Sequence, residues 1–122
     1  MMEEVVDLRE ELESFNADFA AALARHDVDR IAQCYTDDAV LLTSGTATVF
    51  GRGAIVAMFE PAGEGSAPVE FESERMLQGG DLVVDIGGII RAGHVQARYV
   101  VVYRRQTDGS LKLAADVVLP GA

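Results

Sequence analysis

The sequence predicts an α+β domain in which N-terminal helices pack on one face of a curved antiparallel sheet. Two observations carry this prediction. Helical periodicity is confined to the first half of the chain, whereas the second half holds four runs rich in β-branched residues. The stretch 61–68 is rich in Pro, Gly and Ser, but its eight residues make a loop and not a domain boundary. Helices followed by a strand meander therefore predict a single domain over residues 1–122.

Three helices are expected before that loop. Starting at Val5, apolar residues recur at steps of three and four and mark the apolar stripe of the first helix. Asp27 can cap a second helix that runs from Val28 to about Tyr35. A third helix begins near Arg52 and stops at Pro61, because proline cannot continue a helix.

Strands are expected on both sides of the third helix. A short hairpin precedes it and joins Leu41–Thr43 to Thr46–Phe50 through Ser44-Gly45. Four longer strands follow the loop, separated by Gly-containing turns. Their expected ranges are Val69–Leu77, Leu82–Ile90, Val95–Arg105 and Leu111–Leu119.

Composition and charge exclude several classes of partner. The net charge of −10 argues against nucleic acid and against an anionic membrane surface. No segment approaches the roughly 20 apolar residues of a membrane span, and we expect a cytoplasmic protein. Cys34 is the single cysteine and is expected to be a small core residue. No His, Cys and acidic residues have metal-ligand spacing, so neither a metal nor another cofactor is expected.

The order of these elements, with two strand motifs, resembles the NTF2-like superfamily. The motifs are Gly80–Gly87, which carries Asp85, and Arg98–Arg105, which is followed by Asp108-Gly109. The resemblance covers nearly the whole chain, and this superfamily includes the SnoaL-like and ketosteroid-isomerase-like small α+β proteins. It implies a cone-shaped fold that holds a pocket with a variable lining. The fold alone does not specify the function.

The resemblance also excludes the usual steroid isomerase mechanism. That mechanism needs a tyrosine on the first helix, a proton-shuttling aspartate and a second hydrogen-bonding acid. The matching positions here are Phe19, Thr43 and Val101. A phenyl ring cannot donate a hydrogen bond, and a neutral threonine is no general base.

Candidate catalytic residues come from strand alternation and the family register. That register places Asp85, Tyr99 and Asp116 on the inner face of the sheet. A three-residue turn at 91–93 would set Asp85 opposite Tyr99, and a four-residue turn at 106–109 would set Tyr99 opposite Asp116. Two buried acids beside a phenol can supply acid-base catalysis, with at least one raised pKa.

Two alternatives stay open for this row of residues. Alternation in the last strand can instead bury Leu111 and Leu113 and leave Asp116 in water. Asp85, in an otherwise apolar run, can simply hydrogen-bond Tyr99 or the backbone. The remaining pocket lining that we expect is Phe15, Phe19, Tyr35, Met58, Phe59, Val101, Tyr103 and Val118.

The expected function is binding of a small apolar organic ligand. Any chemistry would be cofactor-independent isomerisation, cyclisation or hydrolysis, and the alternative is a non-catalytic binding or assembly module. We also expect a homodimer, because an inward Asp116 leaves an apolar outer face on the sheet. The residues expected on that face are Val100, Val102, Leu111, Leu113, Ala115 and Val117, with Arg98 and Arg104 as a polar rim that could pair with acids of the partner.

Overall fold

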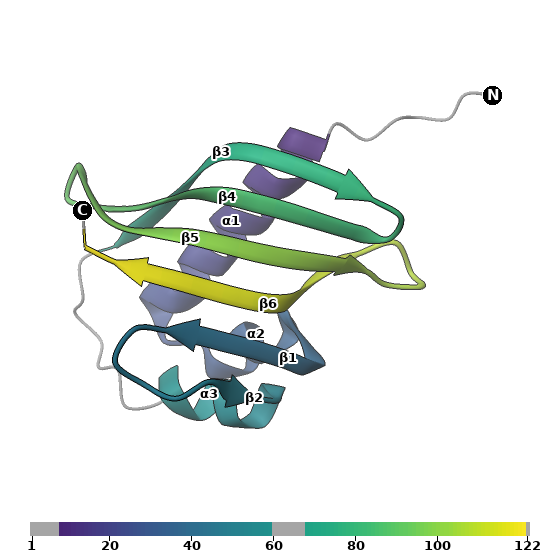
Figure 1. The fold of residues 1–122 in the computed structure, drawn as a ribbon, viewed down its shortest axis with the longest axis horizontal. Helices are drawn as coiled ribbons and strands as arrows, with labels where there is room; N and C mark the ends of the chain where they lie inside the picture. Colours follow the sequence, from purple (N-terminus) through teal and green to yellow (C-terminus); the bar gives the residue numbers. More distant parts are fainter. Residues whose placement is uncertain (1–7, 60–67, 122) are drawn as a thin grey trace.

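The structure is a computed structural model in which residues 8–59 and 68–121 are described. Val5 and Pro61, the expected limits of the helical half, lie outside these ranges. The predicted order of elements is confirmed (Figure 1). The helices are α1 (Leu8–Arg25), α2 (Val28–Gln33) and α3 (Arg52–Phe59), and the strands are β1 (Tyr35–Thr43), β2 (Val49–Phe50), β3 (Val69–Gly79), β4 (Leu82–Arg91), β5 (His94–Arg105) and β6 (Leu111–Pro120).

The six strands form one sheet in the order β2-β1-β6-β5-β4-β3. All neighbouring strands are antiparallel except β1 and β6, so the sheet is mixed where an antiparallel sheet was predicted. The helix α1 crosses one face of the sheet, and no described helix covers the opposite face (Figure 1). We call these the inner and the outer face. No helix in the described ranges is long and apolar enough to cross a membrane.

The second helix is shorter than predicted. Asp27 caps it as expected, since the Asp27 carboxylate accepts a hydrogen bond from the Arg30 amide at 3.2 Å. Tyr35, however, is the first residue of β1 and not the last of the helix. The Leu113 amide donates to the Cys34 carbonyl at 2.7 Å, and Tyr35 pairs with Leu113. Pairing with β6 therefore replaces the last helical turn.

The core lies between α1 and the inner face of the sheet. Leu12 and Ala22 are fully buried on the sheet-facing side of α1, and Cys34 is buried beside them, as expected. The ring of Phe15 meets Tyr103 edge-on, with centroids 4.9 Å apart. This contact sets the distance between α1 and the strands and leaves space between the helix and the sheet.

A bulge in β6 resolves the two alternatives for its register. Tyr103 pairs with Leu113 and Val102 with Ala115, so Ala114 is an extra residue between them. Because one extra residue reverses the side-chain alternation, Leu111 and Leu113 point inward before the bulge and Asp116 points inward after it. The prediction that Leu111 and Leu113 lie on the outer face is therefore wrong.

The register between β4 and β5 also differs from the prediction. The turn holds two residues, Ala92 and Gly93, with φ of 54° and 80°, and a one-residue irregularity follows in β5. Asp85 consequently pairs with Val101, and Val101 pairs with Asp116. Tyr99 lies two residues along β5, opposite Gly87. A shift of two residues keeps every side chain on its predicted face.

Candidate active site

An apolar cavity of about 190 Å³ lies between α1 and the inner face of the sheet. Most of its lining is aromatic or aliphatic, as is usual for small-molecule sites. Eight of the predicted residues line it: Phe15, Phe19, Phe59, Tyr99, Val101, Tyr103, Asp116 and Val118. The other lining residues are Asn16, Leu23, Val69, Phe71, Ile89, Arg91 and Leu113. We call this space the inner cavity.

Asp116 places a carboxyl group in the wall of the inner cavity. Its side chain is 8% exposed, and Oδ2 accepts a hydrogen bond from the Tyr35 hydroxyl at 2.7 Å. Burial raises the pKa of the Asp116 carboxyl, and the bond from Tyr35 opposes that shift. A buried acid with a raised pKa can act as a proton donor or as a neutral hydrogen-bond partner.

Asp85 lies on the other side of Val101 and does not line the cavity. It is 0% exposed, and its Oδ2 accepts hydrogen bonds from the Ser73 hydroxyl at 3.0 Å and the Tyr99 hydroxyl at 3.1 Å. Its Oδ1 has no hydrogen-bond partner among the described residues. Burial raises the pKa of Asp85, against the effect of its two donors. Asp85 can therefore reach a ligand only through Tyr99.

Tyr99 connects Asp85 to the inner cavity, because it lines the cavity and bonds the carboxyl behind it. Burial raises the pKa of Tyr99, so the phenol stays protonated and remains a donor. Its ring lies across Gly87: a Cβ placed there would be 2.6 Å from the Tyr99 hydroxyl oxygen and 2.2 Å from the Glu72 carbonyl oxygen. The absence of a side chain at Gly87 therefore admits the ring of Tyr99.

Two predicted lining residues lie elsewhere. Tyr35 is fully buried behind Asp116 because it belongs to β1, so its hydroxyl positions the carboxyl instead of meeting a ligand. Met58 is 40% exposed and does not border the inner cavity, although its neighbour Phe59 does. Successive helical residues point about 100° apart, so only one of the two can face the sheet.

Sequence reasoning missed the contribution of β3 and of the polar residues Asn16 and Arg91. Alternation in β3 carries a signal that could have found Phe71, which has the same parity as Ser73. Asn16 interrupts the apolar stripe of α1, and its Oδ1 accepts a weak hydrogen bond from the Tyr103 hydroxyl at 3.4 Å. Arg91 has the inner-face parity of β4, but it was predicted to lie in the turn at 91–93, so alternation was not applied to it.

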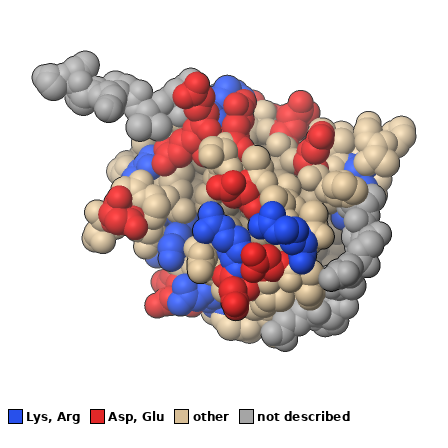
Figure 2. Space-filling model, turned by 180° about the vertical axis from the view of Figure 1, so that it is seen from behind, with Lys and Arg blue, Asp and Glu red and all other residues tan. Residues whose placement is uncertain are grey.

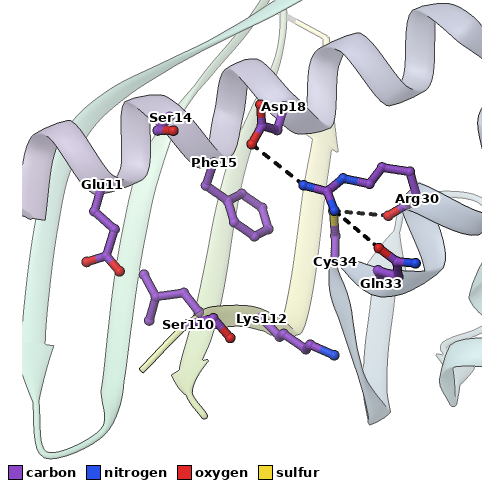
Figure 3. Close-up of a pocket in the computed structure, with 10 residues that line it drawn as sticks. Glu11, Ser14, Phe15, Asp18, Arg30, Gln33, Cys34, Ser110 and Lys112 are labelled. Atoms are coloured by element: carbon purple, nitrogen blue, oxygen red, sulfur yellow. Dashed lines mark hydrogen bonds and ion pairs between the residues drawn. The ribbon is translucent and has the colours of Figure 1, made fainter. Parts of the chain in front are cut away.

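A second, larger hollow of about 460 Å³ opens between α1, α2 and the β5–β6 turn (Figure 3). Its rim is polar and charged, and Phe15 lies between it and the inner cavity. Arg30 pairs there with Asp18 at 3.7 Å, and the Cys34 thiol donates to the Arg30 carbonyl oxygen at 3.4 Å. Acidic and basic side chains are interspersed on this side (Figure 2). The groups largely satisfy one another, so the inner cavity, with its buried acid, is the stronger candidate.

Comparison with known families decides where this fold belongs. The model of the SnoaL-like domain matches residues 17–114, which span the cavity and both aspartates. The chain belongs to the SnoaL-like domain family. A search of curated proteins gave no match. In the described part of this SnoaL-like domain, no group of His, Cys, Asp or Glu is arranged to hold a metal ion.

Solved structures share the fold of this SnoaL-like domain. A ketosteroid isomerase-like protein from Erwinia carotovora atroseptica is 18% identical, with a TM-score of 0.70 and coverage of 97% of this chain and 99% of that one. An NTF2-like protein from Cytophaga hutchinsonii is 17% identical, with a TM-score of 0.72 and coverage of 95% and 100%. A protein named as a candidate calcium/calmodulin-dependent protein kinase type II association domain, from Thiobacillus denitrificans, is 17% identical, with a TM-score of 0.72 and coverage of 87% and 91%. At these identities the likeness concerns the fold alone.

Proposed function

We propose that the inner cavity binds a small, mainly apolar organic molecule, and that Asp116 exchanges a proton or a hydrogen bond with it. The observation that carries this proposal is a buried carboxyl with a raised pKa in the wall of a mainly apolar cavity. Such perturbed groups cluster at functional sites. The volume of about 190 Å³ suits a molecule smaller than a typical drug, with one or two fused rings.

The proposed chemistry is proton transfer without a cofactor, in an isomerisation, cyclisation or hydrolysis. In its ionised form Asp116 takes a proton from the substrate and later returns it. When Asp85 is protonated, as its raised pKa favours, its carboxyl donates to the Tyr99 oxygen, and the single Tyr99 hydroxyl proton can then be donated to a substrate oxygen. Asp85 is thus a positioning residue, a narrower role than the one expected from the sequence.

Binding is tested with 2-naphthamide, a neutral two-ring probe, titrated by ligand-observed NMR. We expect saturable binding that is lost in Val118→Trp, which fills the cavity from β6. Val117→Trp is the matched control, since Val117 is the next residue and lies on the outer face. Equal binding by both variants would show that the probe does not occupy the inner cavity and would contradict the proposal.

Catalysis is tested by the exchange of the α-protons of 2-tetralone in D₂O, followed by NMR. We expect exchange above the buffer rate that is lost in Asp116→Asn. Asp108→Asn is the control, because Asp108 is an exposed turn residue. Binding of 2-naphthamide without any exchange above the buffer rate would leave a ligand-binding protein and remove the catalytic part of the proposal.

A second candidate function is assembly, and the outer face of the sheet favours it. Apolar side chains there stay partly in water although no described element covers them; among them are Leu42, Phe50, Leu77, Leu82, Val95 and Leu119, each at least 40% exposed. Burying such a side chain fully is worth about 1.5–3 kcal/mol. We propose that a second copy of the chain covers this face, since a two-fold symmetric contact pairs an apolar patch with itself.

The rim of that face differs from the expectation. Arg98 pairs with Glu74 at 2.7 Å and Arg104 with Asp38 at 3.5 Å within the chain, so these arginines need no acid from a partner. Sedimentation at micromolar concentration should give about twice the 13.1 kDa chain mass. Leu42→Glu should shift the protein to monomer, whereas Met58→Glu, at a similarly exposed residue on α3, should not. A monomeric unmutated protein would exclude the dimer.

A further inference from the structure

Arg91 lies at the opening of the inner cavity. It ends β4, pairs with Val69 of β3 and with His94 across the turn, and has the same strand parity as Ile89. Val69, Ile89 and Arg91 all line the cavity, and Arg91 is exposed. An exposed residue in the lining marks the place where the cavity meets solvent.

The guanidinium of Arg91 takes part in no ion pair within the described residues. Each of the six ion pairs in residues 8–59 and 68–121 uses an arginine, and none of them uses Arg91. No hydrogen bond is found for its side chain within these ranges. The chain has a net charge of −10, yet a positive charge without a described acidic partner lies beside the apolar cavity.

Arg91 and Asp116 are the two ionisable side chains of Asp, Glu, Lys or Arg type in the cavity wall. Asp116 lies buried in the wall, where burial raises the pKa of its carboxyl, whereas Arg91 is exposed and carries a positive charge. The cavity is therefore polarised, with a fixed positive charge at its opening and an apolar interior.

From this arrangement we propose that Arg91 makes the inner cavity selective for small amphiphilic carboxylates. The ring system of the ligand lies among the aromatic side chains of the wall, and its carboxylate accepts two parallel hydrogen bonds from the guanidinium at the opening. This inference rests on the proposed function, because it assumes that the cavity binds a ligand. It adds the chemical class of that ligand and its orientation.

The planar fork of arginine matches a carboxylate geometrically, so the preference depends on more than charge. A lysine at the same position would keep the charge and lose the paired hydrogen bonds. The orientation also places the end of the ligand remote from the carboxylate toward Asp116 and Tyr99, the two groups of the proposed proton transfer. The carboxylate thus stays bound to Arg91 at the opening while the reaction occurs at the other end of the ligand.

The test compares 2-naphthoate with 2-naphthamide, which share one ring system and differ in charge. Both are titrated by ligand-observed NMR against the unmutated protein, Arg91→Met and Arg91→Lys. Arg75→Met is the matched control: Arg75 is an exposed arginine with no ion pair in the described part of the chain, and it has outer-face parity on β3. We expect the unmutated protein and Arg75→Met to prefer the carboxylate by roughly fivefold or more.

In Arg91→Met the ratio of the affinities for 2-naphthoate and 2-naphthamide should fall to about one, and Arg91→Lys should keep part of the preference. A preference that survives in Arg91→Met, or equal binding of both probes by the unmutated protein, would overturn the assignment of Arg91. The proposed function would stand in either case, since the neutral probe still binds. Failure of both probes to bind would instead contradict the proposed function itself.

Discussion

The inner face of the sheet holds two aspartate–tyrosine pairs on either side of Val101, and they differ in their access to the cavity. Asp116 lines the cavity and accepts one side-chain hydrogen bond, from Tyr35 behind it. Asp85 lies outside the lining and accepts two, and its tyrosine, Tyr99, stands between it and the cavity. In one pair the acid borders the cavity and the phenol lies behind it, and in the other pair the phenol borders the cavity and the acid lies behind it.

This difference shows why a raised pKa alone does not identify a reactive group. Burial raises the pKa of both carboxyls. Only the Asp116 carboxyl itself borders the space that a ligand can occupy, whereas the Asp85 carboxyl acts on that space through a phenol. This difference in access is the reason that we propose an acid-base role for Asp116 and a positioning role for Asp85. The predictions below separate the two pairs, beginning with the largest expected effect.

Replacement of Gly87 by alanine should disrupt the Tyr99–Asp85 pair. The added Cβ would lie 2.2 Å from the Glu72 carbonyl oxygen and 2.7 Å from the Tyr99 ring, so strand and ring must both move. Overpacking of this kind costs about 1–3 kcal/mol of unfolding free energy, and contact with backbone places this case at the upper end. Urea denaturation measures the loss.

The control for that substitution is Gly88→Ala on the same strand. Its Cβ would meet a Val95 methyl group at 3.7 Å, which is ordinary van der Waals contact, so stability should change little. A Gly87→Ala variant as stable as Gly88→Ala would show that the close approach of Tyr99 to β4 is wrong.

Removal of the two phenol hydroxyls should affect the pairs unequally. Tyr35→Phe takes away the one side-chain donor described for Asp116, whereas Tyr99→Phe leaves Asp85 bonded to Ser73. Loss of a buried polar partner costs about 1–3 kcal/mol, and we expect Tyr35→Phe to lie higher in this range than Tyr99→Phe. Denaturation measures both. Tyr99→Phe should in turn impair 2-tetralone exchange more than it weakens 2-naphthamide binding.

A larger stability loss in Tyr99→Phe than in Tyr35→Phe would contradict the expectation that Asp116 depends more on its tyrosine than Asp85 does. In that case the second donor of Asp85, the Ser73 hydroxyl, would not compensate for the loss of the Tyr99 hydroxyl. The exchange assay gives a second readout, since a purely structural Tyr99 would leave the rate per folded molecule unchanged.

The sequence predicted the element order, the inner-face parity of β4 and β5 and eight of the residues that border the inner cavity, because alternation and turn residues record these features directly. It did not predict the bulge at Ala114, since a single extra residue leaves no mark in composition. Because of that bulge, Leu113 and Asp116 are both buried on the inner face. Simple alternation would place them on opposite faces of the sheet. The residue pairs between β4 and β5 were also predicted incorrectly. A register shift of two residues keeps each side chain on its face of the sheet but places Tyr99 opposite Gly87.

The smallest expected effect is on the pH dependence of stability. A raised pKa means that the folded protein holds a proton on Asp116 that the unfolded chain releases near pH 4. Stability from this group is complete at low pH and declines as pH rises from about 4 through the raised pKa, by at most about 1.4 kcal/mol per pH unit. Asp116→Asn should remove this decline, and Asp85→Asn should act in the same direction.

Asp108→Asn is the control with the opposite sign. Hydrogen bonds from Ser110 lower the pKa of Asp108, so its contribution is present at neutral pH and is lost as pH falls. Urea denaturation of the four proteins from about pH 2 to 8 therefore separates the buried acids, whose effect appears above about pH 4, from the exposed one, whose effect appears below it. A decline toward high pH that persists unchanged in Asp116→Asn would mean that this carboxyl is ionised in the folded protein throughout. It would then meet a ligand as a fixed negative charge, and the preference for carboxylates at the opening would have to work against it.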